Sequence, residues 1–195
     1  MKGLEIEIEG IMPLLMNNGI MCDSENEYVR RIAELTPKGS RKPTDEQLAE
    51  RRRLTLKGSM YFDKELGPYI PSENIEACIR QGAAKNRKGR NVLSGLSLIE
   101  LKCPLDYEGP NDQEEIINDE RFIDRRPVIK GKGRVIGYRV RFKEGWRLRF
   151  TLRYDEDIIG KNDIKKAIEA AGSVVGLGDF RPKYGRFEMI KFEDA

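Results

Sequence analysis

Basic side chains alternate with apolar ones near the end of a strongly basic stretch. Residues 121–153 hold 12 Lys and Arg residues against two acids, Asp124 and Glu144, a local charge of 12 − 2 = +10. Arginine presents a planar set of N–H donors that matches phosphate oxygens and also stacks on nucleobases. The chemistry indicated is therefore the binding of a polyanion. Six basic residues share the predicted exposed face: Arg139, Arg141, Lys143, Arg147, Arg149 and Arg153.

The alternation also predicts the element that positions these side chains. Residues 138–143 and 146–154 each change from apolar to polar with a period of two, as a half-buried strand does. Glu144-Gly145 between them would form a tight turn, so we predict a β-hairpin with its aromatic and aliphatic residues in the core. The loop before the hairpin would extend the basic face with Lys130, Lys132 and Arg134.

The first strand offers an alternative role for the arginines. Residues 4–9 alternate strictly between apolar residues and glutamates, which predicts a strand with one buried face. If this strand pairs beside the hairpin, Glu5, Glu7 and Glu9 lie opposite the arginines, and each cross-strand pair stabilises the sheet by about 0.2–1 kcal/mol. Three glutamates cannot neutralise all of these basic residues, so a positive surplus remains in either case.

Residues 176–185 form a second candidate site, a glycine-rich loop. Glycines permit positive φ and close backbone approach, so exposed N–H groups could hold phosphates together with the basic side chains. Aromatic rings could stack on bases, at about 1–3 kcal/mol each. The alternative is a tight helix-to-strand turn with its rings in the core. The candidate contacts are Gly176, Gly178, Phe180, Arg181, Lys183, Tyr184 and Gly185.

Two further basic runs, residues 51–53 and 80–90, lie on predicted helices. The second run contains five basic residues and no acid. A run of like charge is most often a solvated helix face, and that is the favoured interpretation of both.

Histidine is absent from the chain, which excludes Ser-His-Asp, Cys-His and HExxH chemistry. Cys22, Cys78 and Cys103 are far apart without a CxxC pair, so we predict no disulfide, no metal site and no cofactor. The weak catalytic candidate is Asp23, which could bind hydrated Mg²⁺ for RNA cleavage. No second carboxylate is identifiable near it, and an Asp in a loop is usually a turn residue.

The overall composition is that of a globular domain. The chain has 195 residues, 35% of them charged and 38% hydrophobic, with a net charge of +3. It contains no run of 18 apolar residues, and residues 1–5 do not resemble a signal peptide. We therefore predict a cytoplasmic protein without a membrane partner.

The remaining elements follow from local signals. Residues 24–57 are polar, and Thr44 with Gln47 forms a capping box, which predicts a helical insertion. Helices are expected after residue 72 and after Asn162, with strands at 96–101 and 186–192. The order strand, insertion, helix, strand, hairpin, helix, strand predicts an α+β fold, with helices on one face of an antiparallel sheet and its other face open.

Three segments together resemble the RAMP superfamily (repeat-associated mysterious proteins), the RNA-binding subunits of CRISPR effector complexes. Residues 8–16, IEGIMPLLM, are similar to the family's opening strand and turn. Residues 68–80, PYIPSENIEACIR, are similar to the start of its first helix, usually written I-P-G-S-S-L-K-G-x-L-R. Residues 175–187, from VGLG through GRF, resemble its C-terminal glycine-rich loop.

The resemblance implies an RRM-like, or ferredoxin-like, core in a single domain spanning 1–195. Its core would be 1–23, 58–103 and 135–195, and the insertions 24–57 and 104–134 would form thumb-like projections over a guide RNA. In type III backbone subunits an Asp of the first loop cleaves target RNA, a role open only to Asp23 here. The chain departs from the family's Gly-Ser-Ser and Lys with Ser72-Glu73-Asn74 and Glu76, which indicates a divergent, stand-alone relative.

The leading hypothesis is a non-catalytic module of the CRISPR backbone type that scaffolds single-stranded, guide-like RNA. One alternative is a metal-dependent endoribonuclease acting through Asp23. Another is an interaction protein, either a mobile-element mimic of a CRISPR subunit or a self-assembling homo-oligomer. Its partners would then be CRISPR-type subunits or further copies of the chain.

Overall fold

The computed structural model describes residues 1–37, 39, 41–131 and 133–195, so the predicted contact Lys132 lies outside the described residues. In chain order the elements are β1 (Lys2–Gly10), β2 (Leu14–Met16), a 3-10 turn (Gly19–Cys22), α1 (Glu27–Glu34), α2 (Asp45–Ser59), β3 (Phe62–Asp63), β4 (Gly67–Pro71), α3 (Ser72–Ala84), α4 (Gly89–Gly95), β5 (Leu96–Leu98), β6 (Lys102–Asp106), α5 (Gln113–Asn118), a 3-10 turn (Glu120–Phe122), β7 (Ile123–Lys130), β8 (Gly133–Phe142), β9 (Arg147–Tyr154), α6 (Lys161–Ala170), a π-helical turn (Ala171–Val175) and β10 (Phe187–Asp194).

The larger sheet has the strand order β10-β1-β9-β6-β4-β3, and β5 also pairs with β9. Its centre is formed by β1, β9, β10 and β5, which pair antiparallel in the order β10-β1-β9-β5. With α3 after β1 and α6 after β9, the chain follows the split β-α-β path of a ferredoxin-like core. The predicted α+β fold, with an antiparallel sheet and helices, is confirmed.

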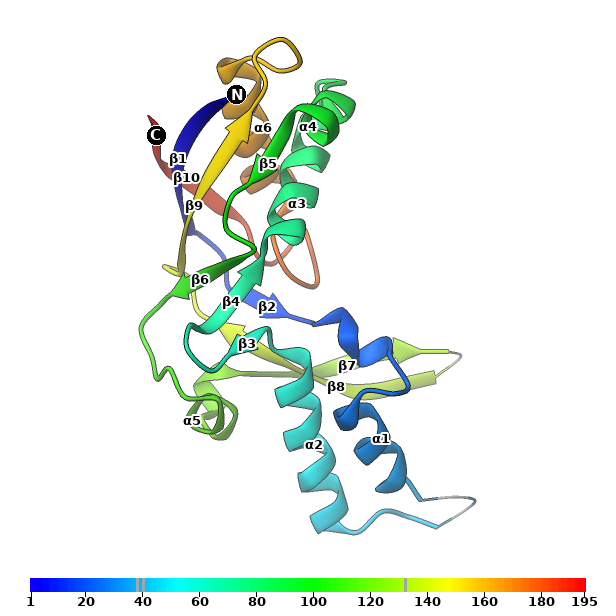
Figure 1. The fold of residues 1–195 in the computed structure, drawn as a ribbon. Helices are drawn as coiled ribbons and strands as arrows, with labels where there is room; N and C mark the ends of the chain where they lie inside the picture. Colours follow the sequence, from blue (N-terminus) through cyan, green and yellow to red (C-terminus); the bar gives the residue numbers. More distant parts are fainter. Residues whose placement is uncertain (38, 40, 132) are drawn as a thin grey trace.

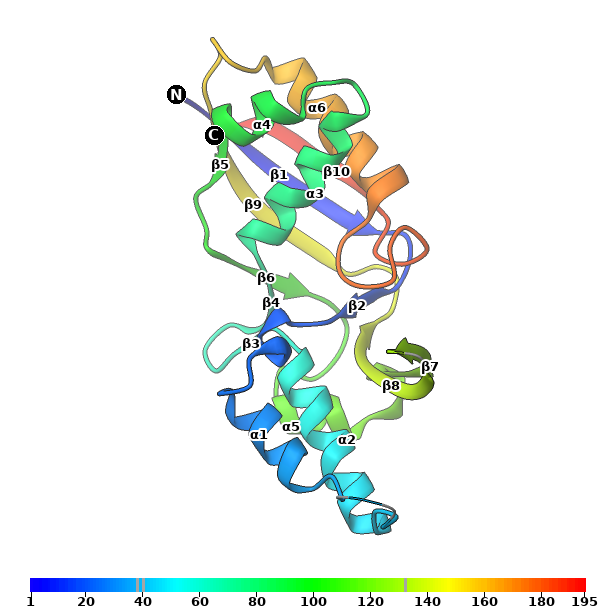
Figure 2. The same ribbon diagram turned by 90° about the vertical axis from the view of Figure 1, so that its right-hand side faces the viewer.

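Helices α3 and α6 cover one face of this sheet (Figure 2). The strict alternation of β1 places Leu4, Ile6 and Ile8 on the covered face, where each is at most 2% exposed. Helix α3 buries Ile75 and Ile79 against the same core. Apolar residues recur at every second position of the strand and about every 3.6 positions of the helices, so each element has one apolar face. These faces pack together as one apolar layer between the sheet and both helices.

A smaller sheet has the strand order β2-β8-β7 and extends to one side of the molecule (Figure 1). The predicted hairpin over residues 138–154 is therefore wrong, because β8 pairs with β7 while β9 pairs with β1 in the larger sheet. The chain changes sheets at Trp146, which is fully buried and donates its Nε1–H to the carbonyl of Met12 at 2.9 Å. Strand β7 escaped prediction because Pro127 interrupts it, and proline is tolerated where a strand lies at a sheet edge, as β7 does.

The predicted insertion 24–57 forms α1 and α2, which extend away from the larger sheet (Figure 1). Helix α2 begins at the capping box. The Gln47 backbone N–H donates to the Thr44 hydroxyl at 3.2 Å, and the Thr44 backbone N–H donates to the Gln47 side-chain oxygen at 3.0 Å. Helix α2 also contacts the second predicted insertion, because Arg53 pairs with Glu114 of α5 at 2.5 Å. The division into a core and insertions remains a prediction. In the part of the chain that is described, no helix has the length and apolar content needed to cross a membrane.

Candidate nucleic-acid interface

On the open face of the larger sheet, Arg147 and Arg149 pair with glutamates. The exposed Arg153 lies on the same face and has no carboxylate within 4 Å among the described residues. Register places Glu9 opposite Arg147 and Glu7 opposite Arg149. The side chains meet at 2.6 Å and 3.0 Å. The same strand pairs Glu5 with Lys191 of β10 at 2.7 Å, and this contact lowers the pKa of Glu5. A phosphate arriving on this face must compete with carboxylates already in place.

Arg139 and Arg141 lie on β8, in the other sheet. Arg139 donates to Asp179 of the glycine-rich loop at 2.8 Å, and Arg141 donates to the backbone carbonyl of Arg121 at 3.1 Å. Arg134 is exposed near the far end of β8, and β7 ends at Lys130. The described candidates are therefore divided between the two sheets: Arg147 and Arg149 lie on the larger one, and Arg134, Arg139 and Arg141 lie on the smaller one.

The glycine-rich loop is packed tightly against β2. Its glycines Gly176, Gly178 and Gly185 all have positive φ. A Cβ atom on Gly178 would lie 2.3 Å from the carbonyl oxygen of Leu15. The N–H of Asp179 donates to that same oxygen, and the N–H of Gly185 donates to Pro13, both at 2.8 Å. Because these two N–H groups donate within the protein, they are not available to a phosphate. Phosphate binding at the loop would therefore depend mainly on side chains.

The rings of Phe180 and Tyr184 lie against an arginine that was not among the contacts predicted from the sequence. The guanidinium carbon of Arg126 lies 4.7 Å from the ring centre of Phe180 and 4.6 Å from that of Tyr184. Arg126 also donates to Asp124 at 2.5 Å and to the Tyr184 hydroxyl at 2.9 Å. These contacts raise the pKa of Arg126, chiefly through Asp124. We call this set (Asp124, Arg126, Phe180 and Tyr184) the arginine clamp; it joins β7 to the loop.

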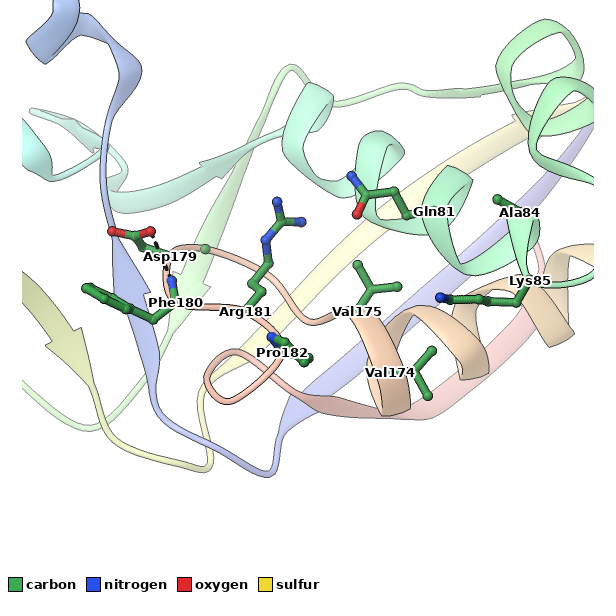
Figure 3. A pocket seen from close by; sticks show the side chains of 10 residues that line it. Gln81, Ala84, Lys85, Val174, Val175, Asp179, Phe180, Arg181 and Pro182 are labelled. Carbon is green, nitrogen blue, oxygen red and sulfur yellow. Dashed lines mark hydrogen bonds between the residues drawn. The ribbon is translucent and has the colours of Figure 1, made fainter. Parts of the chain in front are cut away.

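An open pocket of about 760 Å³ lies between α3 and the glycine-rich loop (Figure 3). Gln81, Ala84 and Lys85 line it from α3, and Asp179, Phe180 and Arg181 line it from the loop. The Arg181 side chain extends toward α3 (Figure 3).

A neighbouring pocket of about 560 Å³ shares Gln81 and Ala84 and continues to Arg80, Arg87 and Arg90 beside α4. We call the two pockets together the basic groove.

The cations of the basic groove are mostly unpaired. Among the described residues of the run 80–90, Lys88 alone comes within 4 Å of a carboxylate, at 3.6 Å from Asp163. Among the described residues, the Arg181 side chain makes one hydrogen bond, a long one of 3.5 Å to the carbonyl of Gly176, and no ion pair. The sequence showed the run, but only the tertiary structure places it beside the loop. The interpretation of this run as a solvated helix face remains a prediction.

The neighbouring thiol is buried, and the candidate acid Asp23 lies in a turn. Cys78 lies beneath the loop, 3.2 Å from the carbonyl of Gly176, and burial raises its thiol pKa to about 12. Asp23 is exposed and accepts the backbone N–H of Glu25 at 2.9 Å, the geometry of a turn. Within the described residues, no group of three or more acidic or cysteine side chains is placed to hold a metal ion.

Comparison with known proteins identifies the fold. No protein-family model and no curated protein matches the sequence. Among solved structures, the chain is similar to one chain of "Cryo-EM structure of the Type III-B Cmr-beta bound to cognate target RNA", with a TM-score of 0.56 and 13% identity. The alignment covers 99% of this chain and 60% of that chain, so this protein spans about three fifths of its length. At this identity, the likeness shows the fold alone, the α+β arrangement with the ferredoxin-like sheet order described above.

Proposed function

We propose that the protein binds single-stranded RNA along the basic groove, as a RAMP-type module of a CRISPR-related assembly. The observation that carries the proposal is a set of cations that have no carboxylate partner among the described residues. They come from α3, the α3–α4 connection, α4 and the glycine-rich loop: Arg80, Lys85, Arg87, Arg90 and Arg181. Polyanion binding releases condensed counterions wherever a phosphate meets such a cation.

The three segments that carry the family resemblance support the proposal because they adjoin one another at this groove. The carbonyl of Leu15, from the first segment, accepts the N–H of Asp179 in the third at 2.8 Å. The thiol of Cys78, from the second, lies 3.2 Å from the carbonyl of Gly176 in the third. Segments remote in sequence thus pack together in the interior next to the groove, and a similar fold occurs in a complex bound to target RNA.

The arginine clamp favours recognition of the backbone over recognition of bases at the loop. Arg126 covers a face of each ring, so neither ring offers that face to a base while the clamp is closed. We expect the groove to hold phosphates with little dependence on nucleotide sequence. Affinity for single-stranded RNA should fall with salt, with a log–log slope near −0.7 for each phosphate neutralised.

The test compares two pairs of substitutions that remove the same charge. RNA of about 30 nucleotides is titrated by fluorescence anisotropy between about 50 and 200 mM salt. We expect Lys85→Gln/Arg181→Gln to lose about tenfold or more in affinity and to reduce the salt slope by about 1.4. The control Arg147→Gln/Arg149→Gln should change affinity less than about twofold, because a paired surface cation contributes little. Equal losses in both variants, or no binding at low salt, would contradict the proposal.

The same preparations separate the alternatives. Cleavage of the RNA with Mg²⁺ that disappears in Asp23→Ala would favour the endoribonuclease. Oligomers that persist after nuclease treatment, in protein that does not bind RNA, would favour the self-assembling or subunit-mimic protein.

A further inference from the structure

A separate open pocket of about 700 Å³ lies where the loop before α1, the end of α2, the β3–β4 region and the start of α5 meet. Four parts of the chain contribute to it, from both predicted insertions and from the core. Its walls carry side-chain amides and half-buried aromatic rings, and we call it the amide pocket. The residues that define it are Asn18, Asn26, Asn111, Tyr28, Phe62 and Tyr69.

The amides of this pocket have donors to offer. The Asn18 side-chain oxygen accepts the N–H of Ile20 at 3.1 Å, and that of Asn26 accepts the N–H of Tyr28 at 3.0 Å. Each of these two oxygens is engaged, while each NH₂ group carries two further donors. A ligand of the pocket would therefore present hydrogen-bond acceptors.

The charges around the pocket largely cancel. Lys57 is paired with Glu114. The carboxylate of Asp112 accepts two backbone N–H groups at the start of α5, at 2.9 and 3.0 Å. The exposed Lys64 also lines the pocket. The site thus suits a planar, uncharged group that has acceptor atoms, attached to a negative group near Lys64.

The position of Asn111 depends on a glycine. Gly67 has φ +74°, and a Cβ atom there would lie 1.9 Å from the side-chain oxygen of Asn111. The absence of a side chain at residue 67 therefore lets this amide enter the wall of the pocket.

The buried strand β2 lies between the segments that line the basic groove and the amide pocket. Asp179 lines the groove and donates to the carbonyl of Leu15, while Asn18 lines the pocket three residues later in the chain. Three residues span at most about 11 Å. One strand of RNA could reach both sites.

We propose that the amide pocket takes one unstacked nucleobase of the RNA that the basic groove holds. This inference rests on the function proposed above. The amide NH₂ groups would donate to carbonyl oxygens and ring nitrogens of the base, Tyr28, Phe62 or Tyr69 would stack on its face, and Lys64 would meet the adjoining phosphate.

The experiment uses the full chain and RNA of about 30 nucleotides containing 5-iodouridine, irradiated and mapped by mass spectrometry. We expect cross-links on peptides that contain Tyr28, Phe62 or Tyr69. Asn111→Asp exchanges an NH₂ donor for a charged oxygen, and it should reduce both these cross-links and the affinity, by about fivefold or more. The control Asn162→Asp makes the same change at an exposed site on α6 and should stay within about twofold of the unchanged protein.

The outcomes separate the two proposals. RNA binding with cross-links confined to the groove, or with Asn111→Asp and Asn162→Asp behaving alike, would overturn the amide pocket and leave the groove intact. Failure of the unchanged protein to bind RNA would overturn the proposed function, and the inference with it. Equal thermal melting of Asn111→Asp and the unchanged protein establishes that any lost affinity is local.

Discussion

Two surfaces of this molecule are rich in basic residues, and they differ in what lies opposite each charge. On the larger sheet, Arg147 and Arg149 face Glu9 and Glu7 across one strand boundary. In the basic groove, the cations come from a helix end and a loop, and Lys85 and Arg181 line the same open pocket. A count of charge finds both surfaces equally well. Under the proposed function, the pairing of each charge decides which surface holds the polyanion.

The largest effect is expected in the arginine clamp, which positions one wall of the groove. Arg126→Ala leaves Asp124, only 8% exposed, without its partner. Breaking a buried pair is costly, and partial exposure reduces that cost to about 2–3 kcal/mol of unfolding free energy. Chemical denaturation measures it. The double substitution Asp124→Ala/Arg126→Ala should recover part of the loss, since no unpaired charge remains; a double variant less stable than Arg126→Ala would argue against a clamp.

A smaller effect is expected where the loop meets β2. Residue 178 has positive φ, and the Cβ atom added by Gly178→Ala would lie 2.3 Å from the carbonyl oxygen of Leu15. We expect the unfolding free energy to fall by about 2 kcal/mol and RNA binding to weaken. Gly145→Ala is the matched control, because its φ is also positive (+90°) and no atom lies within 4 Å of the added Cβ. The unfolding free energy of this control should fall by about 1 kcal/mol, and its affinity for RNA should not change. Equal effects at both sites would mean that backbone strain alone is responsible.

The third prediction removes the carboxylates that pair with the arginines of the larger sheet. Glu7→Gln/Glu9→Gln removes the partners of Arg149 and Arg147, and each exposed pair contributes at most about 1 kcal/mol to stability. If pairing is what keeps this face from binding RNA, the variant should gain affinity at low salt and its salt slope should steepen by up to about 1.4. Unchanged affinity and slope would show that shape, rather than pairing, excludes RNA from the sheet.

The smallest effect concerns pH. Lys191 lowers the pKa of Glu5 in the folded protein. A carboxylate with a lowered folded pKa stabilises the protein above its unfolded pKa, near 4.5, and this contribution is lost as pH falls through the folded value. Thermal melting between about pH 7 and 3 should therefore show a slightly shallower loss of stability in Glu5→Gln than in the unchanged protein. Identical profiles would leave the pair without a measurable role.

Local patterns predicted most of the elements that build the core. The alternation of residues 4–9 predicted β1, and residues 146–154 predicted β9 with Leu148, Phe150 and Leu152 buried. The partner of β8 could not be predicted, because alternation specifies which side chains face inward and carries no information about the neighbouring strand. Pro127 further concealed that partner, β7.

The candidate site was predictable only in part. Composition locates the glycine-rich loop and leaves the role of its rings open, and the tertiary structure shows Arg126 against both rings. Asp124 was visible as one of two acids in a basic stretch, yet its contact with Arg126 depends on how β7 lies against the loop.

By itself the sequence determined the absence of histidine chemistry, the faces of β1 and β9, the start of α2 at its capping box and the places where positive charge accumulates. These properties depend on residue type or on neighbours a few positions apart. The tertiary structure alone decided which charges are neutralised and which stay open. That outcome depends on contacts between residues far apart in the chain, such as Arg149 with Glu7, or Lys85 and Arg181 across the groove.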